Sequence, residues 1–130
     1  MFGNLKAMGA LAGLMQDKQK LTDAAERLKN EAEAMRAPGE SGGGAVRVIA
    51  DGKMRILEVT VSPAAAGAVA DETSRAQVEQ MIAEATNAAL AEAQRRMRLV
   101  VEREARELGL EDMLDKLPAG FGGLPGLPGA

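Results

Sequence analysis

The stretch GESGGGAVRVIADGKMRILEVTVSP, residues 39–63, is where strand-favouring residues cluster in this chain. Residues 45–50 and 53–62 are rich in Val, Ile and Leu. The Asp51-Gly52 pair between these two runs suits a two-residue turn. The pattern therefore predicts an antiparallel β-hairpin at the centre of the fold.

A two-residue turn would also fix the register of this hairpin. Val48 would then lie opposite Arg55, and Val46 opposite Leu57. The apolar residues do not alternate regularly in the second strand, because Ile56 and Leu57 are adjacent. Either a bulge at this point splits the second strand in two, or the turn end of the hairpin is covered on both faces.

A helical pattern precedes the hairpin. Leu or Met recurs every seven residues from Leu14 to Met35, which predicts a helix over residues 11–35. Pro38-Gly39 ends this helix. Residues 40–44, ESGGG, form a flexible approach to the first strand, because the Gly-Lys-Ser/Thr ending of a phosphate loop is missing.

A second helical pattern follows the hairpin. Residues 64–70 are a connection of small residues without a strong structural preference, and residues 71–74 then offer N-cap candidates. Helical spacing continues through Leu108, and Gly109 ends it. The apolar stripe drifts by about a third of a turn, which indicates two packing partners or a bend. Its early and late members are Val78, Met81, Ile82 and Ala85, then Leu90, Met97, Val101 and Leu108.

The amino-acid composition excludes several classes of catalytic and metal-binding site. The chain has no Cys, His, Trp or Tyr, so triads built on His or Cys and metal sites built on imidazole or thiolate are excluded. We therefore expect no enzyme, no catalytic residue, no metal and no cofactor. No apolar run is long enough to span a membrane, and too few aromatic residues are present to stack single-stranded nucleic acid bases.

A length of 130 residues predicts one domain, residues 1–117, followed by a flexible Gly/Pro-rich tail, residues 118–130. A lone hairpin is marginal in water, and helices of about 45 Å would overhang it. Joining two hairpins would bury the surplus apolar surface, so we expect a homodimer with projecting helical arms. The expected interface consists of apolar hairpin residues: Val46, Val48, Ile56, Leu57, Val59 and Val61.

Basic residues cluster on the second helix. Residues 94–106 hold five arginines against two glutamates, a local net charge of +3 within a chain of net charge −3. On a helical wheel the arginines fall within about 160°. Such a face could follow a DNA backbone, but every exposed helix needs a soluble face, and the pattern alone favours this second interpretation. The five are Arg95, Arg96, Arg98, Arg103 and Arg106.

The order of these features resembles the YbaB/EbfC family of small bacterial nucleoid-associated DNA-binding proteins. The similarity covers nearly the whole chain, and although no single motif is diagnostic, the order and spacing of the motifs are fairly specific. The matching segments are MFGNL (1–5), MQDK (15–18), GESGGG (39–44), VRV (46–48), DG (51–52), VTVSP (59–63), NAA (87–89) and LPAGF (117–121).

The resemblance implies an α+β fold, in which an α-β-α protomer with a small antiparallel sheet and two long helices forms a tweezer-like homodimer. It implies binding of double-stranded DNA in the cytoplasm, at the bacterial nucleoid, for chromosome organisation or gene regulation. It makes the arginine face a candidate phosphate-binding surface. Our first interpretation is a DNA-binding dimer whose helical arms contact phosphate through this face and through three lysines of the first helix: Lys18, Lys20 and Lys29. The alternative is a non-catalytic dimeric scaffold that binds a protein partner, such as one acting in recombination or repair.

Overall fold

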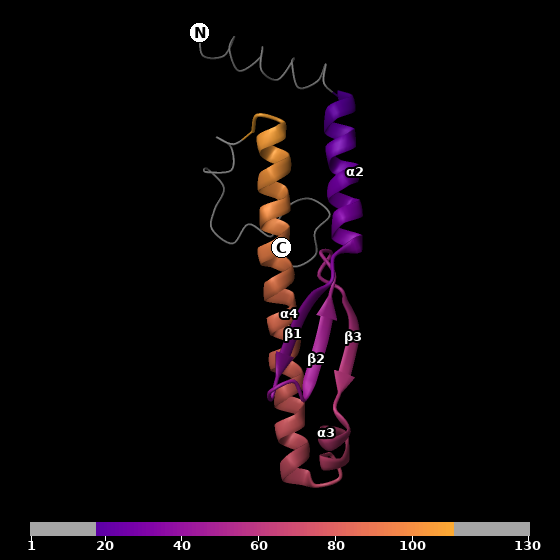
Figure 1. The fold of residues 1–130 in the computed structure, drawn as a ribbon, viewed down its shortest axis with the longest axis vertical. Helices are drawn as coiled ribbons and strands as arrows, with labels where there is room; N and C mark the ends of the chain where they lie inside the picture. The colour runs from indigo at the N-terminus through magenta and orange to yellow at the C-terminus, as the bar shows by residue number, and fades with distance from the viewer. Residues whose placement is uncertain (1–17, 111–130) are drawn as a thin grey trace.

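A computed structural model describes residues 18–110 and shows an α+β fold, as predicted. A small sheet lies along the first half of one long helix, and a second helix projects beyond the sheet beside the other half (Figure 1). The elements, in chain order, are α2 (Lys18–Ala34), β1 (Ala37–Ser41), β2 (Val46–Ala50), β3 (Ile56–Val61), α3 (Pro63–Ala68) and α4 (Glu72–Glu107).

The sheet has three antiparallel strands in the order β1-β2-β3 rather than the two of a hairpin. Strand β1 occupies the segment in which we expected a helix stop and a flexible approach. Its Pro38 is tolerated because β1 lies at the edge of the sheet, where a missing amide hydrogen costs little. The glycines of the ESGGG run then form the turn into β2, with positive φ angles of 64°, 66° and 93° at residues 42–44.

The predicted register between β2 and β3 is wrong. Val46 lies opposite Val61, and Val48 opposite Val59. The connection is longer than two residues because the Asp51 carboxylate organises a wider loop, accepting the backbone N–H groups of Lys53 and Arg55 at 2.9 and 3.0 Å. These hydrogen bonds shift β3 by four residues relative to the predicted pairing.

The predicted irregularity at Ile56 and Leu57 is present as a β-bulge. Ile49 pairs with Glu58 and Ala50 pairs with Ile56, so Leu57 is the extra residue on β3. The bulge lies at the start of β3 and does not split it, because the strand runs without a break over Ile56–Val61.

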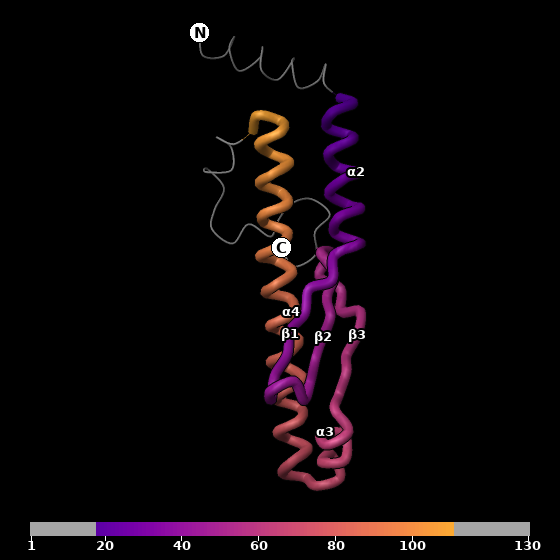
Figure 2. Tube along the Cα trace, in the orientation of Figure 1, coloured from indigo at the N-terminus to yellow at the C-terminus, as the bar shows by residue number. Residues whose placement is uncertain are grey.

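Helix α4 begins and ends where the sequence predicts. The Asp71 carboxylate accepts the backbone N–H of Ser74 at 2.9 Å, and the helix gives way to a turn at Leu108 and Gly109. The small-residue segment before it contains the short helix α3, whose N-cap is Ser62. Figure 2 shows that α3 and the following turn reverse the chain between β3 and α4.

Helix α2 confirms the described part of the first predicted helix. The structure describes it over Lys18–Ala34, and Met35 already lies outside it. Residues 11–17 of the predicted helix fall outside the described residues. The same holds for the opening MFGNL motif, the domain boundary at residue 117 and the Gly/Pro-rich tail.

The core lies between the sheet and α4. Val46 and Val48 of β2 pack with Ala85, Ala89 and Ala93, which recur every four residues along α4. These small side chains let β1 and β2 approach the helix backbone. The predicted stripe included Ala85 but missed Ala89 and Ala93, because alanine gives little hydrophobic signal.

Other members of the predicted stripe vary in burial. Val78 and Met97 are buried as predicted. Leu90, Val101 and Leu108 are only half-buried. No set of α4 residues covers β3 as Ala85, Ala89 and Ala93 cover β1 and β2, so much of the apolar surface of β3 faces solvent.

Candidate nucleic-acid interface

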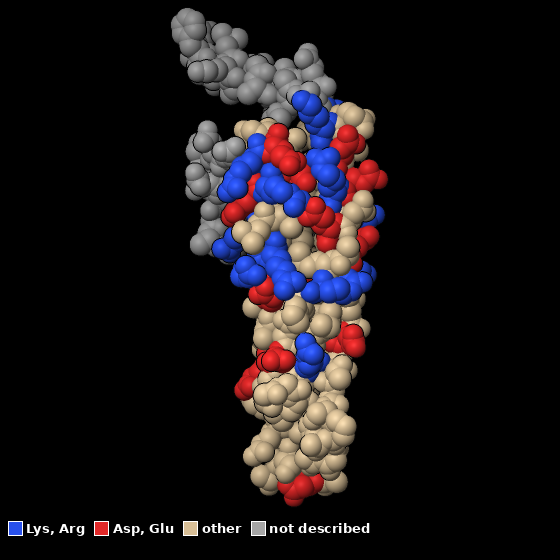
Figure 3. All heavy atoms as spheres, viewed as in Figure 1, with Lys and Arg blue, Asp and Glu red and all other residues tan. Residues whose placement is uncertain are grey.

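Charged side chains gather at one end of the molecule. Figure 3 shows Lys, Arg, Asp and Glu concentrated over α2 and the second half of α4, whereas the end formed by α3 is mostly uncharged. We call α2 and residues 94–107 of α4 the arms. Within residues 18–110, these two helices therefore present the surface on which Lys and Arg side chains could contact a polyanion.

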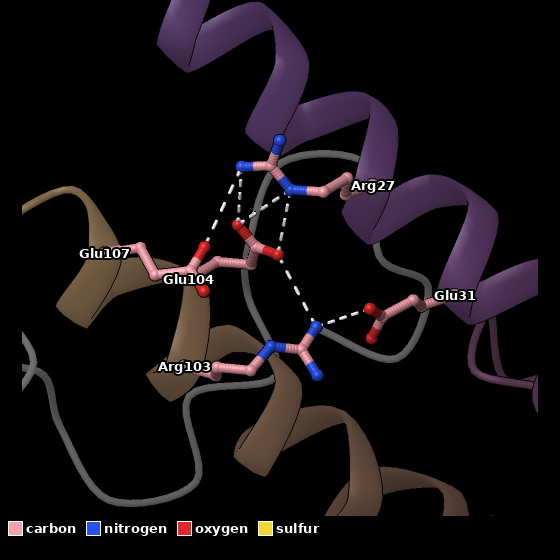
Figure 4. Close-up of polar contacts among 5 residues, drawn as sticks. All are labelled: Arg27, Glu31, Arg103, Glu104 and Glu107. Atoms are coloured by element: carbon pink, nitrogen blue, oxygen red, sulfur yellow. Dashed lines mark hydrogen bonds and ion pairs between the residues drawn. The ribbon is translucent and has the colours of Figure 1, made fainter.

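The arms are joined by a group of five charged residues that we call the arm network: Arg27, Glu31, Arg103, Glu104 and Glu107 (Figure 4). Arg27 of α2 donates from Nε to both carboxylate oxygens of Glu104, at 3.2 and 3.3 Å, and from Nη2 to Oε2 at 3.0 Å. Arg27 Nη2 also lies 3.9 Å from Glu107 Oε2. The Glu104 side chain is 4% exposed, so its carboxylate is largely removed from water, whereas the Arg27 side chain is 49% exposed.

Arg103 joins the network from α4. Its Nη2 donates to Glu31 of α2 and lies 3.5 Å from Glu104 Oε1. The hydrogen bond from Arg27, together with the charges of both arginines, holds the pKa of Glu104 below its ordinary value. Two arginines and three glutamates give the network a net charge of −1, so it does not itself attract phosphate.

A second group of charges centres on Glu92. Arg95 Nη2 and Arg96 Nε donate to Glu92 Oε1 at 2.6 and 2.9 Å, which lowers the pKa of Glu92 to about 2. Arg96 also donates from Nη1 to the carbonyl oxygen of Arg36 at 3.0 Å, so it ties α4 to the segment that enters β1. Arg95 remains 62% exposed.

The predicted phosphate-contact residues therefore fall into two groups. Arg95, Arg96 and Arg103 have carboxylate partners. The other five are exposed and form no ion pair within residues 18–110. These five, the open cations, are Lys18, Lys20, Lys29, Arg98 and Arg106.

Sequence reasoning did not assign a role to Glu104. A signal was available, because Glu104 lies seven residues after Met97 and therefore on the same buried side of α4. An acidic residue at such a position needs a cationic partner from a neighbouring element. Nothing local could have identified that partner, since Arg27 is 77 residues away in the chain.

The residues predicted to form the dimer interface also fall into two groups, buried and exposed. Val46 and Val48 are completely buried inside the single chain, so they are core residues rather than surface available to a partner. Ile56, Leu57 and Val59 are 39%, 43% and 48% exposed, and Val61 is half-buried. All four lie on β3, whose outer edge is unpaired within the described chain.

The acidic side chains of the described segment are scattered or paired with cations. Residues 18–110 contain no group of three Asp or Glu side chains placed to hold a metal ion. Each helix described for this chain is either too short or too polar to cross a membrane.

Fold and surface define the class: a small α+β protein whose charge is concentrated on projecting helices. The YbaB/EbfC DNA-binding family matches residues 8–107, and the chain belongs to this family. A nucleoid-associated protein of Ruminiclostridium cellulolyticum is 31% identical, covering 92% of this chain and 89% of its own length. Nucleoid-associated proteins of Acetivibrio thermocellus and Thermobifida fusca are 30% and 28% identical, covering 92% and 90% of this chain, and 90% and 93% of their own lengths.

Proposed function

We propose that this protein is a nucleoid-associated protein of the bacterial cytoplasm that binds double-stranded DNA without catalysis, for chromosome organisation or gene regulation. The observation that carries the proposal is the set of open cations on both arms, which are free of carboxylate partners within the described chain. Membership of a DNA-binding family supports it. The names of the relatives support the nucleoid as the location.

The open cations would contact phosphate rather than bases. Lysine and arginine side chains that neutralise phosphates release counterions, so affinity falls steeply with salt, with a slope of about −0.9 in log–log form per phosphate contacted. Arg98 and Arg106 serve this role on α4, and the three lysines serve it on α2. Arg95 is a weaker candidate, because a phosphate would have to compete with Glu92 for its guanidinium.

The working form is a homodimer joined through β3. Its exposed edge and apolar side chains are a liability in a monomer. Pairing with a second β3 would satisfy the edge, and helices packed across the junction would cover the apolar side chains. The opposite edge of the sheet, β1, carries Pro38 and lies against α4, so the sheet would extend through β3 alone and assembly would stop at two copies. Two pairs of arms would then project from a six-stranded sheet like tweezers around a duplex.

The test is the affinity of the purified protein for a mixed-sequence duplex across a salt series. Reversing Arg98 and Arg106 to Glu should lower affinity at least tenfold and flatten the salt slope by about 0.9 for each phosphate that is no longer neutralised. The matched control is Arg75→Glu, which changes an exposed arginine near the uncharged end of α4 that has no ion pair within residues 18–110.

Equal affinity for the double variant and for unchanged protein would remove the open cations from the interface. No binding by the unchanged dimer at low salt would reject DNA as the ligand.

A second candidate function rests on Leu99. This leucine is 54% exposed on the charged half of α4, where it has no evident role in contacting phosphate. A single exposed leucine is ordinary on a protein surface, so Leu99 is a candidate contact only for a protein partner that also binds neighbouring residues, such as one acting in recombination or repair. If Leu99→Ser abolished capture of such a partner while DNA affinity stayed unchanged, the scaffold function would be supported.

A further inference from the structure

Glu104 is a buried acidic side chain in the middle of the charged arms. Its carboxylate receives Arg27 from α2 and Arg103 from α4, with the closest atoms 3.0 and 3.5 Å apart. The two arginine side chains are each 49% exposed, whereas Glu104 is 4% exposed. The acid, rather than the arginines, is therefore the buried centre of the arm network.

Fully buried apolar packing between the arms is limited, because Leu21 and Leu28 of α2 are only half-buried. The buried residues of α2 are Ala24 and Ala32, whose small side chains remove little apolar surface from water. At the C-terminal end of α2, the Gly52 N–H donates to the Ala32 carbonyl oxygen at 2.8 Å, and Lys53 Nζ lies 2.6 Å from Glu33 Oε1. These contacts fix α2 where it meets the sheet. Further along the arms, the network around Glu104 supplies the polar link.

The network is unsuited to direct phosphate contact. Transfer of Arg27 and Arg103 from Glu104 to a phosphate would leave a buried carboxylate without its cationic partners, which is strongly unfavourable. The net charge of −1 would also repel the phosphate. Arg103, which the helical wheel grouped with the phosphate contacts, therefore belongs to the link between the helices.

We infer that Glu104 is a positioning residue for DNA binding, because it holds α2 against α4 through Arg27 and Arg103. The lysines of α2 and the open arginines of α4 are then presented to one duplex as a single rigid set. This inference rests on the proposed function. It assigns a negatively charged residue a favourable part in binding a polyanion.

Because of this role, the direction of the change in DNA affinity distinguishes positioning by Glu104 from simple electrostatics. Glu104→Gln removes a negative charge from the arms, so simple electrostatics predicts tighter DNA binding. Loss of positioning predicts weaker binding, because a glutamine cannot accept both N–H groups of the Arg27 fork as a carboxylate does. We expect affinity to fall five- to tenfold and the salt slope to flatten by about 0.9 for each α2 lysine that no longer reaches a phosphate.

The matched control is Glu102→Gln. It removes the same charge from the same helix, but Glu102 forms no ion pair within residues 18–110. Its affinity should be unchanged or higher. Amide hydrogen exchange provides a second measurement: Glu104→Gln should speed exchange along α2 while β2 keeps its protection.

A second variant keeps the inference testable if Glu104→Gln fails to fold. The double variant Arg27→Cys/Glu104→Cys removes both partners, so neither charge is left buried alone and net charge is unchanged. The chain has no native cysteine, so a short bismaleimide can link these two positions selectively. DNA affinity should fall in the unlinked protein and recover after intramolecular linking, with mass spectrometry excluding links between chains.

The outcomes separate the two proposals. If unchanged protein binds DNA and Glu104→Gln binds as tightly as Glu102→Gln, with α2 still protected, positioning by Glu104 is rejected and the DNA function stands. If linking the double variant restores no affinity, the same conclusion follows. If unchanged protein does not bind DNA at low salt, the proposed function fails and the inference fails with it.

Discussion

Glu104 occupies a position on α4 that would ordinarily hold an apolar side chain. It follows Met97 by two helical turns on the buried side of the helix, yet it carries a carboxyl group paired with Arg27 and Arg103. On a helical wheel Arg103 groups with Arg98 and Arg106, because the wheel does not include the facing helix. The contacts of Glu104 separate Arg103, which links the two helices, from Arg98 and Arg106, which form no ion pair within residues 18–110.

The lowered pKa of Glu104 predicts that the stability of the protein depends on pH in the acidic range. The pKa of Glu104 in the folded protein lies below the unfolded value, which is about 4.3. Such a carboxyl stabilises the fold fully when the pH is above the unfolded pKa, and this stabilisation is lost as the pH falls through the folded pKa. We expect the stability difference between unchanged protein and Glu104→Gln to be constant above about pH 5 and to shrink below about pH 4. Urea unfolding at a series of pH values measures it.

Other carboxyls also respond to acid, so the comparison with the variant is essential. Burial opposes ionisation of Asp51, but hydrogen bonds from Arg55 and Lys53 outweigh that effect and lower its pKa. The pKa of Glu92 is likewise lowered by Arg95 and Arg96. A difference that does not change with pH would show that Glu104 is not a paired carboxylate in solution.

Gly39 offers a prediction about backbone contact. A Cβ atom there would lie 2.2 Å from the Ala89 nitrogen and 2.4 Å from the Ala85 oxygen, both backbone atoms that cannot rotate away. Gly39→Ala should lower the free energy of unfolding by about 3 kcal/mol, at the upper end of overpacking effects. Chemical denaturation would measure the change.

Gly67 provides the control for this prediction. It lies in α3, its φ is not positive, and a Cβ added there would have no neighbouring atom within 4 Å. Gly67→Ala should therefore stabilise the protein by about 0.5 to 1 kcal/mol, because alanine favours helix more than glycine does. Similar effects of the two substitutions would mean that β1 does not lie against α4.

At the scale of elements, local signals predicted α4 well. Its start depends on the Asp71 cap, and its end coincides with Gly109, both of which act within one turn of the chain. Strand β1 was missed because its sequence, APGES, contains proline and glycine and lacks β-branched residues. It is a strand because Gly39 fits against α4 and because β2 supplies its hydrogen-bonding partner.

At the scale of the whole molecule, the described chain has a thin core. The cluster between sheet and helix consists of valines and alanines, while β3 leaves three large apolar residues exposed. Helix α4, at 36 residues, is about 54 Å long and extends well beyond strands of five or six residues. These features support the proposal that a second copy covers β3.

The proposed dimer can be tested at β3. Val59→Glu places a charge on the apolar side of the strand, where burial in an interface is strongly unfavourable, and should weaken the dimer about 100-fold or more. Thr60→Glu places the same charge on the opposite face, opposite Arg47, and should leave the dimer intact. Light scattering across a dilution series would measure both, and a stable Val59→Glu dimer would exclude β3 as the interface.

Local patterns in the sequence were sufficient to predict the α+β class, helix α4, the described part of the first helix, the strands β2 and β3, and the cluster of arginines on α4. These follow from periodicity, caps and composition, which act over one or two turns of chain. The third strand, the register of β3 and the separation of linking from open cations depended on the tertiary structure. The physical reason is distance along the chain: the Asp51 loop docks against Ala32, and Arg27 meets Glu104 across 77 residues, so neither contact is encoded in a local pattern.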